Sequence, residues 1–308
     1  MKAKYVVLTI GIVALVVGSI GLGAGIWAAG GVKELSTFQP FDAGTRKLDS
    51  FNIDELRKID IWNGNGSVTI LKTTDSEISM DYLENDHFGY TDSFKDGKLR
   101  IHNTTPLDTA KSFFNAIFAG IIPWGLSTEK QDLVVRIPEN LTFDIDIWSG
   151  NGDIRFEEGF VNNSDSEIDI YSGNGNVYVK NQNVKEIEIS TGNKSINIAD
   201  CTAQKIDVEL GNGQVKFSGN IIAEELEVRT GNGNIETVDE GTLLTADGEI
   251  YTGNGSINVR LNGTRNDFNI KSKTGWGNID ISGSNNADAP NKLKVTTGNG
   301  NITVSFTA

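Results

Sequence analysis

The chain is poor in the residues that build covalent and metal-centred sites. Among its 308 residues there is one cysteine, Cys201, and there are two histidines, His87 and His102. A single cysteine excludes an intramolecular disulfide, and two histidines supply little for a zinc centre or a histidine-based triad. We therefore expect no catalytic residue and no cofactor, and we expect Cys201 to be a small buried apolar residue.

Proline and basic residues are also scarce. The sequence has 5 prolines against 35 glycines, which indicates many tight turns rather than a disordered linker. Its 27 lysines and arginines stand against 41 acidic residues, for a net charge of -14. Because phosphate recognition needs a basic surface, we expect no nucleic-acid partner. Cationic peptides and divalent cations are compatible with this charge.

The longest run without charge stands at the N-terminus. Residues 5–29 carry no charged side chain, and at about 1.5 Å per residue they can cross a hydrocarbon core of about 30 Å. Lys2 and Lys4 precede the run, so the positive-inside rule places the N-terminus in the cytoplasm. A cleavable signal peptide is the alternative, although its apolar region is usually shorter. The predicted parts are a cytoplasmic N-terminus (1–4), a transmembrane anchor (5–29), a stalk (30–50) and an extracellular domain (51–308).

The predicted extracellular domain repeats a motif centred on Gly-Asn-Gly. From Gly150 onward, the first glycines of successive motifs are 23, 19, 19, 20, 22, 22 and 23 residues apart. Such a period is typical of solenoids, and β-branched residues alternate on both sides of each turn, as in half-buried strands. We predict an all-β fold, a parallel β-solenoid or β-helix of about 20-residue repeats. An antiparallel β-prism or sandwich is the alternative, because each turn can also close a hairpin.

The turn residues themselves suggest two roles. Glycine accepts positive φ, so the chain can bend sharply at each motif. If the repeats stack in register, the asparagines between the glycines are expected to form a hydrogen-bonded ladder. The repeated turn asparagines are Asn65, Asn151, Asn174, Asn193, Asn212, Asn232, Asn254 and Asn299, and Trp276 replaces the asparagine in one motif.

Two outward-facing columns are candidate binding surfaces. The position four before each first glycine is acidic from Asp60 onward and becomes Lys271 and Lys294 in the last two motifs. Carboxylates about 4.8 Å apart repel one another and favour bound cations, so we predict a candidate column for Ca²⁺ or cationic peptides. A solvated acidic face is the alternative. Its members are Asp146, Asp169, Glu188, Asp207, Glu227 and Glu249.

The second column lies two positions before the glycine and contains Trp62, Trp148, Tyr171 and Tyr251. Exposed aromatic rings in a row would suit sugars. Ordinary cross-strand pairing is the alternative explanation.

An insertion, predicted at 84–130, interrupts the repeats after the first motif. Gly64 and Gly150 are 86 residues apart, about four repeat lengths, so we expect two or three degenerate coils between them. Segments 78–82, 98–101 and 133–137 in this interval are typical of strands. Within it, apolar residues spaced by four predict a short helix with one broad apolar face. This face either caps one end of the solenoid or forms a membrane or partner patch. The patch residues are Phe113, Phe114, Ile117, Phe118, Ile121, Ile122 and Trp124.

These units, of the form [IV]-x-[IV]-x-[ST]-G-N-G-x-[IV]-x-[IV] behind an apolar N-terminal run, resemble the bacterial putative-adhesin domain family. The segment Leu133–Pro138 before the main array is also similar to that family. The resemblance covers roughly residues 51–308 and implies a β-helical, extracytoplasmic domain of unknown function, sometimes linked to envelope stress responses. It carries no catalytic residues onto this chain.

Together these observations predict a non-catalytic, membrane-anchored, cell-surface binding or scaffold protein of the putative-adhesin type. Its expected partners are the membrane and a cell-wall glycan, a cationic peptide or an envelope protein. One alternative is an envelope-stress sensor or regulator that binds cationic peptides or a membrane partner. Another is a β-helical polysaccharide-active enzyme, which would require clustered acids in a groove, whereas here the acids are evenly spread.

Overall fold

The computed structural model describes residues 42–48, 52–64, 66–84, 89–104, 132–139, 141–156 and 162–308. Its described helices are two 3-10 turns, η1 (Ile53–Glu55) and η2 (Arg265–Asp267), and the remainder of the regular structure is β-strand. No helix among these residues is long and apolar enough to span a bilayer. The predicted anchor at 5–29 lies outside the described residues.

Each repeat forms one coil of two strands separated by the Gly-Asn-Gly turn. We call them the pre-turn and the post-turn strand. The pre-turn strands are β2 (Lys58–Asn63), β8 (Asp144–Asn151), β10 (Asn162–Asn174), β12 (Asn183–Asn193), β14 (Thr202–Asn212), β16 (Asn220–Asn232), β18 (Thr242–Asn254), β20 (Phe268–Trp276) and β22 (Asn291–Asn299). The post-turn strands are β3 (Val68–Thr73), β9 (Ile154–Phe156), β11 (Val177–Lys180), β13 (Ile196–Ala199), β15 (Val215–Ser218), β17 (Ile235–Thr237), β19 (Ile257–Leu261), β21 (Ile279–Ile281) and β23 (Ile302–Phe306).

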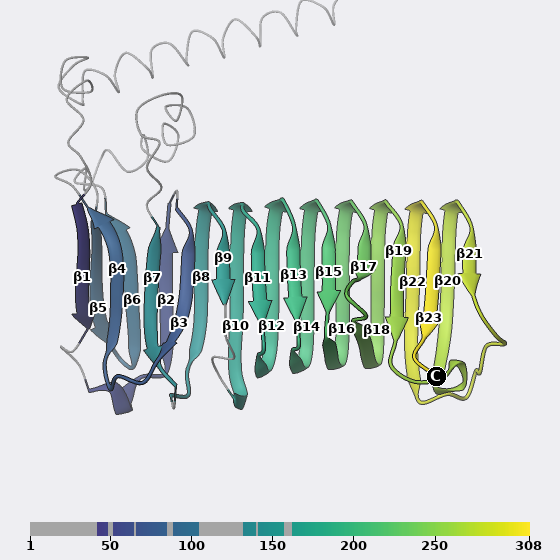
Figure 1. Ribbon diagram of the computed structural model, residues 1–308, viewed down its shortest axis with the longest axis horizontal. Coiled ribbons are helices and arrows are strands. Elements are labelled where there is room, and N and C mark those ends of the chain that lie inside the picture. The colour runs from purple at the N-terminus through teal and green to yellow at the C-terminus, as the bar shows by residue number, and fades with distance from the viewer. Residues whose placement is uncertain are drawn as a thin grey trace, which may run out of the picture. The chain divides into compact units, whose positions relative to one another are not determined.

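Successive coils stack in parallel and in register. Pre-turn strands pair with pre-turn strands, as Ile168 of β10 does with Ile187 of β12, and post-turn strands pair with post-turn strands, as Val177 does with Ile196. Figure 1 shows the two strands of each coil repeated side by side along the stack. The predicted parallel solenoid is therefore confirmed, and the antiparallel alternative is wrong for these coils.

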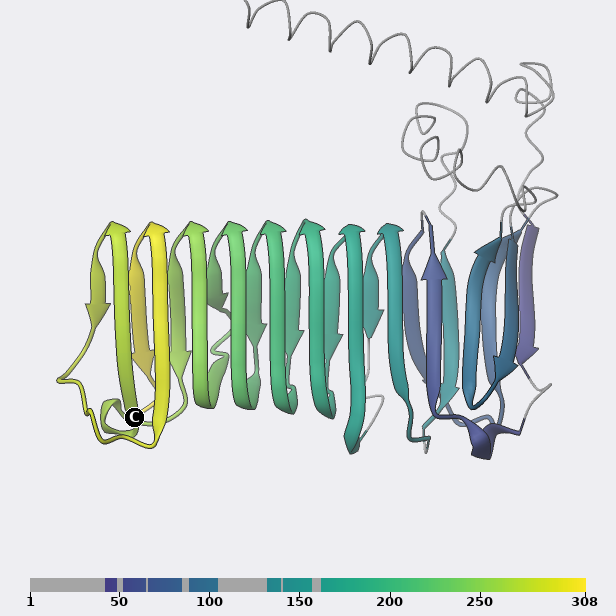
Figure 2. The ribbon, with the colours of Figure 1, turned by 180° about the vertical axis from the view of Figure 1, so that it is seen from behind.

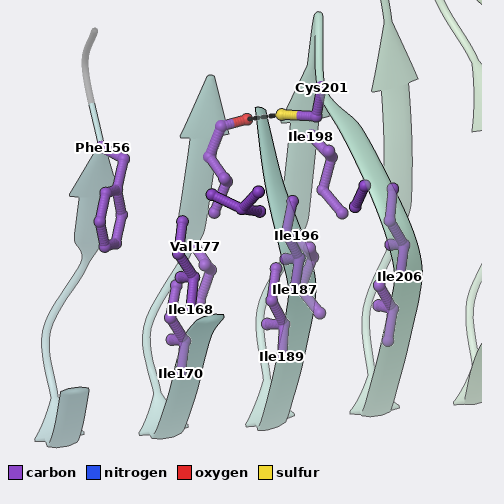
Figure 3. Packing of buried hydrophobic residues seen from close by; sticks show 14 of the residues in the cluster. Phe156, Ile168, Ile170, Val177, Ile187, Ile189, Ile196, Ile198, Cys201 and Ile206 are labelled. Atoms are coloured by element: carbon purple, nitrogen blue, oxygen red, sulfur yellow. Dashed lines mark hydrogen bonds between the residues drawn. The ribbon is translucent and has the colours of Figure 1, made fainter. Parts of the chain in front are cut away.

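The core lies between the two rows of strands. Alternate residues of each strand point inward, so Ile168 and Ile170 of β10 and Val177 of β11 are fully buried. Figure 3 shows such side chains packed together in successive coils, with the buried Cys201 among them. Burial also raises the pKa of the Cys201 thiol to about 11, which suits the predicted inert residue.

The order of the coils in space departs from the order in the sequence at both ends. The last coil of the chain, β22 and β23, lies between β18–β19 and β20–β21, because β22 pairs with both β18 and β20. At the other end, β2 lies between β8 and β6 (Lys98–Thr104). Figure 2 shows the yellow C-terminal coil inside the yellow-green one. Neither the first nor the last coil of the sequence is an outermost coil.

Antiparallel strands cover the end of the stack formed by β6 and β7 (Leu133–Pro138). Strand β5 (Gly89–Lys95) pairs with β6, and β4 (Ile78–Glu84) pairs with β7. β1 (Asp42–Leu48), in the predicted stalk, pairs with β4. The strands predicted at 78–82, 98–101 and 133–137 are present as β4, β6 and β7, and β6 with β7 forms one of the expected degenerate coils. Strand β5, at 89–95, lies inside the predicted insertion and pairs with β6. The patch residues from Phe113 to Trp124 lie outside the described residues.

From Gly150 onward, the first glycine of each turn is needed because neighbouring coils approach closely. A Cβ on Gly173 would lie 2.5 Å from the carbonyl oxygen of Gly150, and one on Gly192 would lie 2.7 Å from that of Gly173. A positive φ, expected from the sequence, does not explain the first glycines, because none of them has one. In several turns it is the second glycine that has a positive φ, as Gly213 does at 145°. Lys194 takes the place of a second glycine at a φ of 95°, a region that strains a non-glycine residue.

The predicted asparagine ladder is present. Each amide nitrogen donates to the side-chain oxygen of the preceding coil, as Asn193 does to Asn174 at 2.7 Å. Six such bonds run without interruption, all in one direction. Trp276 stands next to Asn299 in register, so the ladder ends where the tryptophan replaces asparagine.

Candidate functional site

The acidic column predicted from the sequence is a continuous row on the outward face of the pre-turn strands. Its neighbours in space pair in register from strand to strand. The row reads Asp60, Asp146, Asp169, Glu188, Asp207, Glu227 and Glu249. Arg100 adjoins Asp60 at one end, and Lys294 followed by Lys271 adjoins Glu249 at the other. We call these seven carboxylates the acidic row.

Basic side chains neutralise the row near β2. Lys98 Nζ lies 2.8 Å from a carboxylate oxygen of Asp60, which is only 7% exposed. Lys58 Nζ lies 2.7 Å from Asp146. Lys98 and Lys58 are the first residues of β6 and β2. Each stands two residues before the position of its strand that lies in register with the acidic row, and so on the same face of the sheet. At this end the negative charge is balanced within the protein.

The other end of the row is also paired. Lys205 Nζ lies 3.7 Å from Asp207, Arg229 forms ion pairs with Glu227 and Glu249, and Lys294 Nζ lies 2.9 Å from Glu249. The contact with Lys294 lowers the pKa of Glu249. Because these groups are partly exposed, each pair contributes about 1 kcal/mol or less.

Two carboxylates in the middle of the row differ from the others. Within the described residues, no salt bridge reaches Asp169 or Glu188. Tyr171 donates its hydroxyl to Glu188 at 3.0 Å. Burial, together with the charges of Asp146 and Glu188 on either side, raises the pKa of Asp169 to about 7. The centre of the row is therefore a local excess of negative charge.

Four ring-bearing side chains form a second row beside the first. Trp62 stacks on Trp148 with ring centroids 5.5 Å apart, Trp148 stacks on Tyr171 at 4.5 Å, and His102 lies 5.8 Å from Trp62. Because Trp62 and Tyr171 cover opposite faces of Trp148, the exposed 44% of Trp148 presents ring edges. The row stabilises the sheet by cross-strand stacking. Tyr251, predicted for the same column, is separated from it by Ser190, Glu209 and Arg229.

The described chain holds little else that could carry chemistry. No group of three or more histidine, cysteine or acidic side chains in the described ranges is arranged to hold a metal ion, and the predicted Ca²⁺ site remains a prediction. A shallow, mostly apolar groove of about 370 Å³ crosses five pre-turn strands at their first residues, beside Val184, Ala203 and Ala223.

Sequence reasoning placed all six candidate carboxylates in one row but missed the groups that divide it. Lys58 and Lys205 each stand two positions before an acid of their own strand, and Lys98 stands two positions before the residue that pairs with Asp60. Their spacing was visible in the sequence, but the acids that they contact depend on which strands are neighbours. His102 was missed because β6 lacks a Gly-Asn-Gly turn that would have aligned it with the repeats.

The family model described as Toastrack DUF4097 matches residues 56–306. No curated protein matches the chain. A structure named as a putative adhesin from Bacteroides fragilis NCTC 9343 is 15% identical, with a TM-score of 0.48, over 86% of this chain and 97% of that one.

Two further structures resemble the chain at a similar level. A putative adhesin from Parabacteroides merdae ATCC 43184 is 12% identical, with a TM-score of 0.44, and covers 87% of this chain and 96% of that one. A protein named as a putative lipid binding protein from Parabacteroides distasonis ATCC 8503 is 15% identical, with a TM-score of 0.46, over 85% and 96% of the two chains.

Proposed function

Because the chain belongs to the Toastrack DUF4097 family, we propose that it is a non-catalytic, cell-surface binding protein whose acidic row binds a cationic partner. The pre-turn strands present the same outward positions in coil after coil. Such a surface suits an extended partner, because each coil adds an equivalent contact. A transmembrane anchor at 5–29 would hold this surface outside the cell, and the uncharged composition of that segment supports it.

The observation that carries this proposal is the unpaired centre of the acidic row. Asp60 and Asp146 on one side, and Asp207 and Glu249 on the other, already have basic partners. Asp169 lies between two other carboxylates about 4.8 Å away in the parallel sheet, which at an effective dielectric of about 20 costs about 3 kcal/mol per neighbour before screening. A lysine or arginine side chain from a partner would remove this repulsion.

The aromatic row favours a cationic peptide segment over a glycan as the partner. A sugar ring would meet the edges of Trp62 and Trp148, whereas stacking on sugars uses ring faces, which these residues place against one another. The hydroxyl of Tyr171 is bonded to Glu188, and the indole nitrogen of Trp62 donates to Asp60 at 2.9 Å. These bonds fix the carboxylates in place and so lower the entropic cost of binding.

The test is a titration of the full-length chain, in mild detergent, with a fluorescently labelled nine-residue polylysine peptide. We expect the double variant Asp169→Asn, Glu188→Gln to bind roughly tenfold more weakly, with a smaller salt dependence. The matched control replaces two acids of the post-turn strands, Glu236→Gln and Asp280→Asn, and changes the net charge equally.

If the two double variants weaken polylysine binding equally, net charge alone explains the loss of affinity, and the proposal is overturned. Binding of an N-acetylglucosamine hexamer that is lost in Trp148→Ala and unaffected by the acidic variants would instead assign the face to glycans. A cationic antimicrobial peptide that binds like polylysine would favour the envelope-stress role among binding functions.

A further inference from the structure

The two ends of the coil stack are built differently. At one end, the outermost coil of β6 and β7 is covered by the antiparallel strands β5 and β4. At the other end, β20 pairs with β22 and β21 pairs with β23, and no described strand lies on their outer side (Figure 1). The free edge of a sheet is a template for an added strand, so the uncovered end requires an explanation.

The loop after β21 covers part of this end. The backbone N–H of Ile270 donates to the side-chain oxygen of Asn285 at 2.8 Å, and the side chain of Asn269 donates to the carbonyl of Ala287 at 3.0 Å. Arg265 holds Asn285 in place with a bond of 2.7 Å. The loop therefore makes, beside the first residues of β20, the hydrogen bonds that a neighbouring coil would otherwise make. We call the remainder, residues 271–281, the open edge.

Backbone donors of the open edge lack the partners that their equivalents have. In the inner coils from β12 onward, the residue after the turn asparagine donates to the next coil, as Gly255 does to Asn299 at 2.8 Å. The first residue of the post-turn strand does the same, as Ile302 does to Asn278 at 2.9 Å. Gly277 and Ile279 occupy these positions at the open edge, and no described group accepts their N–H hydrogens.

Two side chains of the open edge are exposed where their equivalents are polar or buried. Trp276 is 79% exposed and replaces a ladder asparagine. Ile279 is 44% exposed, while Ile257 and Ile302 at the same position are fully buried. Exposed tryptophan beside uncovered aliphatic surface is typical of the anchor residues of interfaces.

The charge of the open edge selects the kind of partner. Lys294 is paired with Glu249 at 2.9 Å, but Lys271 and Lys273 have no carboxylate within salt-bridge distance in the described chain. A strand added beside β20 would place its side chains about 4.8 Å from these lysines, and acidic residues there would pair with them. A second copy related by two-fold symmetry would pair antiparallel with β20, and in the register centred on Ser272 it would bring Lys271 of each copy opposite Lys273 of the other.

We propose that the open edge binds an extended, acidic segment of another protein as one more β-strand. The N–H groups of Gly277 and Ile279 would donate to the backbone carbonyls of that segment, in the manner of strand addition. Two of its acidic side chains would lie beside Lys271 and Lys273, and an apolar side chain would cover Trp276. This site is distinct from the acidic row, which attracts the opposite charge.

The experiment measures binding of a fluorescently labelled, acetylated peptide of alternating glutamate and valine to the full-length chain by anisotropy. The same peptide with lysine in place of glutamate is the control. We expect only the acidic peptide to bind, against the net charge of -14, and we expect Lys271→Glu combined with Lys273→Glu to weaken it roughly tenfold. Ile279→Pro should also weaken it, because it removes an outward N–H at the first residue of an edge strand, where proline is tolerated.

Thermal unfolding of each variant checks that the fold is intact. No binding of the acidic peptide at millimolar concentration, or equal binding of both peptides, would overturn the proposal. Binding that survives both Ile279→Pro and the lysine substitutions would do the same. If light scattering shows a dimer that Trp276→Asn converts to a monomer, the occupant of the open edge is a second copy and not an acidic segment.

Discussion

At the residue scale, the first glycine of each turn has a role in stacking rather than in backbone conformation. Its hydrogen faces the carbonyl of the matching glycine in the preceding coil, at distances that leave no room for a methyl group. One first glycine differs. A Cβ on Gly64 would meet only the side-chain oxygen of Asn103, at 3.9 Å.

This difference gives a matched pair of substitutions. Gly173→Ala places a Cβ 2.5 Å from the carbonyl oxygen of Gly150, so it must push two coils apart, and we expect a loss of about 3 kcal/mol in the free energy of unfolding. Gly64→Ala, with open space around it, should change that free energy by less than about 1 kcal/mol. Chemical denaturation of both variants measures the contrast, and equal losses would show that the turn conformation, not the close approach, requires glycine.

At the scale of strands, the acidic row is an interaction between elements. Each carboxylate is unremarkable within its own strand, and only the parallel register places it beside its neighbours. Asp169 has the ordinary acid pKa of 3.8 when the chain is unfolded, and its pKa in the fold is about 7. Between these values the folded protein binds more protons than the unfolded chain, so the free energy of unfolding falls as the pH rises from about 4 to about 7.

Asp169→Asn removes this dependence. At pH 8 we expect the variant to unfold at a higher temperature than the parent. The difference should be equivalent to about 1 to 2 kcal/mol in the free energy of unfolding, after allowance for solvent screening. At pH 4 the two proteins should unfold at the same temperature. Glu249→Gln is the control of opposite sign, because Lys294 lowers the pKa of Glu249 and its loss should destabilise the protein at neutral pH. A stability difference for Asp169→Asn that is independent of pH would contradict the assigned cause.

The strands and the outward columns could be predicted from the sequence because period and alternation are local properties. The spacing of Gly-Asn-Gly and the β-branched residues around it located the coils, the ladder and the six carboxylates. The ion pairs of Lys58 and Lys98 could not be predicted, since β2 has β8 on one side and β6 on the other only because the first coil is inserted between two later ones. Strand β4 was predicted at 78–82, but its antiparallel pairing with β7 was hidden, as was the whole of β5, because antiparallel pairing leaves no mark on a 20-residue period.

At the scale of the whole stack of coils, the insertion of the first and last coils has a physical consequence. An outermost coil has neighbours on one side only and loses half of the interfaces that stabilise a repeat. The chain places β22 and β23 inside the stack, where both sides are paired, and leaves β20 and β21 outermost. The connecting loop, through Asn285, then covers part of the exposed coil.

This coil order can be tested by pairs of introduced cysteines at the ends of the pre-turn strands. Adjacent strands of the sheet are about 4.8 Å apart, within the range of Cα separations that a disulfide spans, whereas strands two places apart exceed it. Asn254→Cys with Asn299→Cys should therefore form a disulfide on mild oxidation, as should Asn299→Cys with Trp276→Cys. Asn254→Cys with Trp276→Cys should not, although these positions are adjacent in the order of the sequence.

The native Cys201 is fully buried and should not interfere. Non-reducing electrophoresis after partial proteolysis distinguishes the three pairs. Because sequential repeats normally stack in sequence order, a disulfide between positions 254 and 276 is what simple stacking would give, and observing it would refute the inserted coil. It would also remove the open edge from β20 and β21 and transfer it to β22 and β23, where Ile302 and not Ile279 would carry the unpaired N–H.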